Sequence, residues 1–166
     1  MKKHIPSIPM PKLIPQPIET KGRTLAEQLR VWIFEVRKWK LAEDWDYTLP
    51  NGEKIVIPAD FEFDGASIPR PLWGILSPIG LLLIPGLIHD FGYRYDYIWT
   101  YDAKGKVYKG HENAGREYWD QLFYDVGMAV NDMEEVNFLA WLALSFAGEL
   151  AWRKNRALDE DELIPG

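Results

Sequence analysis

The sequence has no cysteine, and this absence excludes several kinds of chemistry. The 166-residue chain cannot form disulfides, bind zinc or an iron–sulfur cluster through thiolates, or use a cysteine nucleophile. Histidine is also scarce, with three in the chain. A metal ion would therefore have to be bound by histidine, carboxylate or carbonyl groups.

An excess of positive charge and a long uninterrupted apolar run are missing as well. The chain has 19 Lys and Arg against 25 Asp and Glu, a net charge of -6, which disfavours binding to nucleic-acid phosphates. Glycine and proline interrupt the apolar stretch from Leu72 to Ile88, and the uncharged stretch 138–148 is shorter than the roughly 18 residues that a membrane span needs. The first residues are basic, but prolines interrupt the apolar residues after them, so we predict no signal peptide. We expect neither a nucleic-acid partner nor a transmembrane segment.

What the sequence does contain is enough apolar surface for a folded body. It is 47% hydrophobic and 14% aromatic, and its length fits one domain at about 100 to 200 residues per domain. We predict an extended proline-rich arm over 1–22, a single domain over 23–157 and an acidic tail over 158–166. A charge run of that kind is usually solvated.

The arm carries prolines at positions 6, 9, 11, 15 and 17, which favour extended backbone. Apolar side chains stand between these prolines, and we predict that they bind another surface: Ile5, Ile8, Met10, Leu13 and Ile14. That surface is either a partner protein or neighbouring subunit, or the body of the same chain.

The body has the pattern of an α+β fold, with a small antiparallel sheet packed on about three helices. The stretch from Thr24 to Arg30 predicts one or two helical turns, and aromatic and branched residues predict strands over 31–37, 39–49 and 53–57. Asn51-Gly52 predicts a hairpin, and a second hairpin is expected around 102–105. Further helices are predicted from 81 or 85 to 97, from 112 to about 128, and from 133 to about 155.

One histidine, His89, stands in a setting that could support catalysis. On a helix, His89 and Tyr93 share a face, and Asp90 borders the same region. Asp120 on the next helix is the best candidate to orient the imidazole, so that His89 could act as a general base. Asp64, in a turn before glycine, is the other acidic residue expected to have a fixed position. The alternative is a structural network of hydrogen bonds.

Basic residues near these acids have a structural interpretation. Arg94 could pair with Asp64 or Asp120, as could Arg70, and Arg116 shares a helix face with Asp120. No serine-centred elbow, phosphate-binding loop, HExxH or EF-hand pattern is present. The residues alone therefore leave open whether the chain is an enzyme.

Three strings together resemble a family of small proteins of unknown function encoded by bacteriophages and prophages. They are the segments 57–70 (IPADFEFDGASIPR), 86–93 (GLIHDFGY) and 116–123 (REYWDQLF), similar to VPxGFxTDxASxPR, HDxxY and RxxxDxxF. The sequence departs from the first pattern at Asp60 and Phe63 but keeps Asp64 and Ser67. The resemblance implies a phage origin and a shared pocket, since the pattern centres on polar residues, without an established activity.

The HDxxY string, followed by an aspartate on a partner helix, also resembles the active site of phospholipase A2 enzymes. That resemblance implies His89 as the base, Asp90 as a ligand of calcium rather than zinc, with Asp64 near the same ion, Asp120 as the orienting group and Tyr93 in the network. The disulfides of that fold cannot form here.

The leading hypothesis is a bacteriophage structural or assembly protein, associated with the virion or tail. Its arm would bind other phage structural proteins or copies of itself, and the polar cluster would organise the body. The alternative is a metal-assisted hydrolase of lipid or cell-envelope esters. We expect the protein in the virion or in the host cytoplasm.

Overall fold

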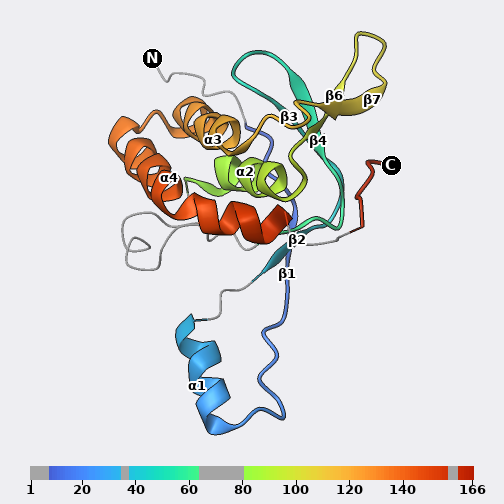
Figure 1. The fold of residues 1–166 in the computed structure, drawn as a ribbon. Helices are drawn as coiled ribbons and strands as arrows, with labels where there is room; N and C mark the ends of the chain where they lie inside the picture. The colour runs from blue at the N-terminus through green and yellow to red at the C-terminus, as the bar shows by residue number, and fades with distance from the viewer. Residues whose placement is uncertain (1–7, 35–37, 64–80, 157–160) are drawn as a thin grey trace, which may run out of the picture.

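The computed structural model describes residues 8–34, 38–63, 81–156 and 161–166. The helices and strands, in chain order, are β1 Leu13–Pro15, α1 Leu25–Phe34, β2 Trp39–Leu41, β3 Trp45–Thr48, β4 Lys54–Ile57, β5 Glu62–Phe63, α2 Leu83–Tyr95, β6 Ile98–Tyr101, β7 Val107–Gly110, α3 Arg116–Asn131 and α4 Glu134–Arg156. Helices α2, α3 and α4 pack together beside the strands (Figure 1). Helix α2 contacts the other two helices and also strands β5 and β6. The predicted α+β class is confirmed.

The strands form two small antiparallel sheets. One has the order β1-β2-β5 and the other the order β3-β4-β6-β7. The hairpin predicted at Asn51-Gly52 joins β3 to β4, and Gly52 has a φ of 87°, which favours glycine. The hairpin predicted around 102–105 joins β6 to β7. Strand β4 pairs with β6 across the two hairpins.

Two of the predicted strands were wrong in type or extent. The strand expected over 31–37 is helix up to Phe34, because Thr24 and Glu27 form a capping box that starts α1 upstream. The strand expected over 39–49 is split into β2 and β3, which belong to different sheets. The chain bends between them, where the Asp44 carboxylate accepts the backbone N–H of Ala59 at 2.7 Å.

The three C-terminal helices lie close to the predicted positions. Helix α2 packs so closely on α3 that a Cβ atom on Gly92 would lie 2.3 Å from the Trp119 ring. The buried side chains of both sheets and of α2 and α3 form one hydrophobic core. No helix among the described residues is long and apolar enough to cross a membrane.

The described part of the arm lies along the body. Strand β1 pairs with β2, and the Pro9 carbonyl accepts the indole N–H of Trp45 at 2.9 Å. Ile8 and Leu13 pack against the core, while Met10 and Ile14 remain exposed. Ile5 lies outside the described residues. The arm therefore meets its own body in part and keeps two of its apolar side chains in solvent.

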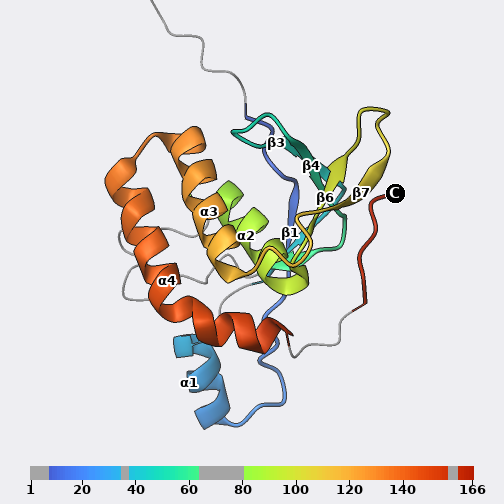
Figure 2. The ribbon, with the colours of Figure 1, turned by 45° about the horizontal axis from the view of Figure 1, so that its top comes forward.

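Residues 161–166 of the acidic tail also lie on the body, whereas the sequence predicted a solvated tail. Glu162 accepts a hydrogen bond from the Tyr97 hydroxyl and pairs with Lys109, and the Leu163 carbonyl accepts the indole N–H of Trp99 at 2.9 Å. In the tilted view the tail runs down beside β6 and β7 (Figure 2). It adds side chains to the outer face of the four-stranded sheet.

Candidate functional site: a buried His–Asp–Tyr cluster

Helices α2 and α3 bring His89, Tyr93 and Asp120 together, as the sequence predicted. His89 and Tyr93 are one turn apart on α2, and Asp120 faces them from α3. All three side chains are buried, with His89 only 1% exposed. The cluster is thus enclosed between helices and is not an open surface site.

Asp120 accepts hydrogen bonds from three directions. His89 Nε2 lies 3.0 Å from Asp120 Oδ1, and the Tyr93 hydroxyl donates to the same oxygen at 2.5 Å. Arg116 Nη1 donates to Asp120 Oδ2 at 3.1 Å, across one helical turn. Both carboxylate oxygens are therefore engaged, and the guanidinium balances the charge of the carboxylate.

Helix α4 closes the cluster through residues that the sequence motifs did not indicate. Arg116 also donates to the Ser145 carbonyl at 3.3 Å, and its Nε lies 3.6 Å from Glu149 Oε2. Gly148 lies so close that a Cβ atom there would be 2.5 Å from the Tyr93 hydroxyl oxygen. In the sequence, small residues of this helix such as Ala140 and Gly148 allow close packing, but they do not identify the partner.

The electrostatics of the cluster favour a charged histidine and a neutral tyrosine. Burial alone would lower the pKa of His89, but the hydrogen bond to Asp120 and the charges of Asp90 and Asp120 outweigh it and raise this pKa above its usual value. Burial, together with the bond to the Asp120 carboxylate, raises the pKa of Tyr93 far above its usual value. Tyr93 thus remains a hydrogen-bond donor.

Asp90 lies at the other side of the imidazole. Its Oδ1 is 3.7 Å from His89 Nδ1, so the two groups interact by charge. Calcium takes six to eight oxygen ligands, yet the described ranges contain no group of three or more His, Asp or Glu side chains that could share an ion. Asp64, predicted as the second ligand, lies outside those ranges. The described residues by themselves do not form a calcium cage.

The arginines predicted to pair with the acidic residues do not all lie at the cluster. Arg116 pairs with Asp120, whereas the Arg94 guanidinium lies over the Phe61 ring, 5.1 Å from its centre. Ser67 and Arg70 belong to 64–80, outside the described residues. Among the described residues, the predicted partner of Asp120 that forms an ion pair with it is Arg116, on the same helix.

A second pair, only partly buried, ties the turn before α3 to the first hairpin. His111 Nε2 lies 2.8 Å from Glu53 Oε2, and its ring stacks on Tyr118 with centres 5.0 Å apart. Burial would raise the pKa of Glu53, but hydrogen bonds to His111 and Thr100 outweigh it and lower the pKa. No sequence motif pointed to Glu53, because its partner His111 is distant along the chain.

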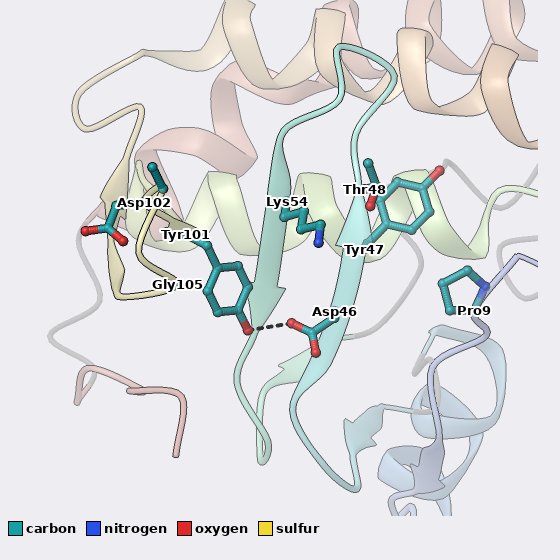
Figure 3. Close-up of a pocket in the computed structure, with 9 residues that line it drawn as sticks. Pro9, Asp46, Tyr47, Thr48, Lys54, Tyr101, Asp102 and Gly105 are labelled. Atoms are coloured by element: carbon teal, nitrogen blue, oxygen red, sulfur yellow. Dashed lines mark hydrogen bonds between the residues drawn. The ribbon is translucent and has the colours of Figure 1, made fainter.

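An open hollow of about 720 Å³ lies on the four-stranded sheet, away from the cluster. Its lining residues are Pro9, Asp46, Tyr47, Thr48, Lys54, Tyr101, Asp102, Ala103 and Gly105. The Tyr101 hydroxyl donates to Asp46 at 2.5 Å (Figure 3), and burial and this carboxylate raise the pKa of Tyr101 to about 12. None of the cluster residues borders this hollow.

Comparison with known proteins gives a family and one distant relative. The family model described as "Protein of unknown function (DUF1353)" matches residues 39–144. An uncharacterized protein, y4jT, from Sinorhizobium fredii is 31% identical over 83 residues, which are 49% of this chain and 25% of that protein. The chain therefore spans about a quarter of the length of this curated relative. No solved structure matches.

Proposed function

The chain belongs to the DUF1353 family of proteins of unknown function, and we propose that it is a bacteriophage structural or assembly protein, associated with the virion or tail. It joins its assembly through the N-terminal docking segment, defined as residues 8–34. This segment lies outside the range that the family shares, so it adds a binding element to the common body. Its partners are other phage structural proteins or further copies of the chain.

The observation that carries this proposal is the position of α1. The helix stands apart from α2, α3 and α4 (Figure 1), and among the described residues it has no extensive packing against another helix or strand. Leu25 is 76% exposed and Leu29 is 49% exposed. An isolated helix of this length is marginal in water, so a partner that covers these leucines would stabilise it.

The base of the docking segment is fixed to the body. The β1–β2 pairing, the Trp45–Pro9 hydrogen bond and the partly buried Leu13 hold it there. Met10 and Ile14 in the same segment also remain exposed. A projecting element with a fixed base loses less conformational freedom on binding than a loose tail does.

The buried cluster supports a structural role for the polar residues of the HDxxY and RxxxDxxF strings. Asp120 joins α2 and α3 directly and reaches α4 through Arg116. Its three polar contacts lie in the interior, where satisfied networks specify one packing arrangement. The cluster therefore serves to hold α2, α3 and α4 together in the body to which the docking segment is attached.

The test uses the phage or prophage that encodes the chain. With Leu25→Glu and Leu29→Glu together, we expect the protein to fold but to be lost from purified particles, as detected by mass spectrometry. The matched control is Tyr108→Glu, which alters an exposed side chain on β7 and should leave incorporation unchanged. Absence of the wild-type protein from particles, with normal particle yield after gene deletion, would refute the proposal.

A second candidate, a hydrolase of lipid or cell-envelope esters, is favoured by one observation. Asp120 holds His89 through Nε2 and leaves Nδ1 on the opposite side, while Tyr93 holds Asp120. In such an enzyme Nδ1 would take a proton from water as its oxygen attacks the ester carbonyl carbon, and would return it to the leaving alcohol. Since the pKa of His89 is raised, activity would increase with pH through that pKa.

This candidate is tested with p-nitrophenyl butyrate and with short-chain phosphatidylcholine micelles. Hydrolysis should disappear in His89→Gln and persist in His111→Gln, which removes the other described histidine. Equal rates in the wild type and His89→Gln would end the hydrolase hypothesis. The assembly proposal would be unaffected, because it depends on α1.

A further inference from the structure

Helix α4 is apolar on two opposite faces, although only one of them packs against the body. The inner face contains Asn137, Ala140, Leu144 and Gly148, which are buried toward α2 and α3. On the outer face Phe146 is 83% exposed and Leu150 is 80% exposed. A helix that covers the edge of a monomer would normally have polar residues there.

The outer side chains form one stripe along the helix. At about 100° per residue, six positions fall within about 80° of the helix circumference. This outer stripe consists of Glu135, Leu139, Leu142, Phe146, Leu150 and Arg153. Glu135, Leu139 and Arg153 are also exposed, and Leu142 is half-buried. In Figures 1 and 2, α4 lies at the side of the molecule, beyond α2 and α3.

The outer stripe is complementary to the outer stripe of a second copy that runs in the opposite direction. Glu135 lies nine residues before Leu144 and Arg153 nine residues after it, and Leu142 and Phe146 lie two residues on either side. Leu139 and Leu150 are five and six residues from the same centre. A second α4 in antiparallel orientation would therefore pair apolar side chains in the middle and opposite charges at both ends.

The helix termini extend this charge pattern. Glu134 and Glu135 occupy the first turn, and Arg153, Lys154 and Arg156 the last turns. Arg153 Nε donates to Glu149 in its own helix, which leaves further guanidinium N–H groups for a second carboxylate. A parallel pair would place like charges together at each end.

From this symmetry we propose that the protein forms a twofold dimer in which the outer stripes of two α4 helices pack antiparallel and cross between Leu142 and Phe146. A twofold interface uses the same patch on both copies, as this stripe does. The dimer leaves α1 free, so it is independent of the docking segment. Each particle-binding unit would then present two α1 helices.

The first test measures mass by light scattering during size exclusion at about 10 to 100 µM of the full chain. The wild type should be a dimer, and Phe146→Glu and Leu150→Glu should be folded monomers, with dissociation constants raised at least roughly tenfold. The matched control, Leu25→Glu, places the same charge on the exposed leucine of α1 and should remain a dimer. A monomeric wild type would overturn the proposal, and so would dissociation by Leu25→Glu alone.

Charge reversal tests the antiparallel orientation. Glu135→Arg and Arg153→Glu should each weaken the dimer at low salt by roughly two- to tenfold, and the double reversal should restore it, because each end again has one charge of each sign. In a parallel dimer position 135 meets its own copy, so the double reversal would restore nothing. Failure of restoration would overturn the orientation.

The absence of natural cysteines allows a direct geometric test. In the proposed dimer position 139 of one copy lies beside 150 of the other, while the two copies of position 139 are about 15 Å apart along the helix. Mixed Leu139→Cys and Leu150→Cys proteins should form disulfide-linked dimers on oxidation, and each variant alone should not. Efficient linkage of Leu139→Cys by itself would contradict the proposed packing.

Discussion

At the scale of single residues, Asp120 holds the polar interior together. Asp120→Asn would put an amide group where the carboxylate now accepts from His89, Tyr93 and Arg116. Removing one partner of a buried ionic network costs about 3 to 5 kcal/mol, so we expect a loss of that size in the free energy of unfolding. Urea unfolding followed by circular dichroism measures it.

The control for this substitution lies five residues further along the same helix. Asp125 is exposed and accepts a hydrogen bond from Gln121 at 2.9 Å. Asp125→Asn should change the free energy of unfolding by no more than about 0.5 kcal/mol. Equal losses in both variants would show that Asp120 does not have the proposed structural role.

His89 should make stability depend on pH. Its folded-state pKa is raised above the unfolded value of about 6.5, so its contribution is fully present below that value and is lost as pH rises through the folded pKa. The wild type should therefore lose stability, relative to His89→Gln, as pH increases from about 6 to 9. Urea midpoints across this range provide the measurement. Parallel curves for the two proteins would contradict a raised pKa.

At the scale of helices and strands, the contact of α2 with α3 depends on one glycine. A Cβ atom at Gly92 would lie 2.3 Å from the Trp119 ring, and Trp119 is completely buried. Gly92→Ala should destabilise the fold by roughly 1 to 3 kcal/mol through overpacking. Thermal and urea unfolding would detect this change.

Gly86 on the same helix gives the matched control. A Cβ atom there meets no atom of the described residues within 4 Å, so Gly86→Ala should be neutral or stabilising by up to about 1 kcal/mol, as expected from helix propensity. If both substitutions destabilised equally, the effect would come from α2 itself and not from its contact with Trp119.

The elements also show what the sequence could predict and what it could not. The two hairpins and the helices α2, α3 and α4 follow local signals: turn residues and periodic apolar side chains. The branched and aromatic stretch 31–34 looks like a strand, yet the capping box at Thr24 and Glu27 extends α1 through it. Strand propensity is weak against such local hydrogen bonds and packing.

The candidate site also has contacts that the sequence could predict and contacts that it could not. Helical spacing placed His89 with Tyr93, and Arg116 with Asp120, and an antiparallel pair of helices was enough to join these two faces. The contributions of Gly148 and Ser145 could not be predicted, because they depend on how α4 lies over the first two helices. Long-range contacts of this kind leave no periodic signal in the sequence.

At the scale of the whole molecule, the chain ends described here both contribute to the body. Residues 8–15 extend the β1-β2-β5 sheet, and residues 161–166 lie on the other sheet. The backbone N–H of Gly166 donates to Asp44 Oδ2 at 2.8 Å, beside the bend that separates the two sheets. The segments outside the matched family range thus brace the shared body from two sides.

The tail provides the prediction that belongs to this scale. Leu163 packs against the core, whereas its neighbour Ile164 is exposed. Leu163→Ala should reduce the free energy of unfolding by about 1 to 2 kcal/mol, less than for a fully buried leucine, and should increase hydrogen exchange in β6 and β7. Ile164→Ala, which shortens an adjacent apolar side chain in solvent, should change neither quantity.

Because the tail also pairs Glu162 with Lys109 at the sheet surface, loss of the Leu163 contact should make the remaining contacts more sensitive to salt. If Leu163→Ala and Ile164→Ala behaved alike in stability and exchange, the tail would not be part of the cooperative fold.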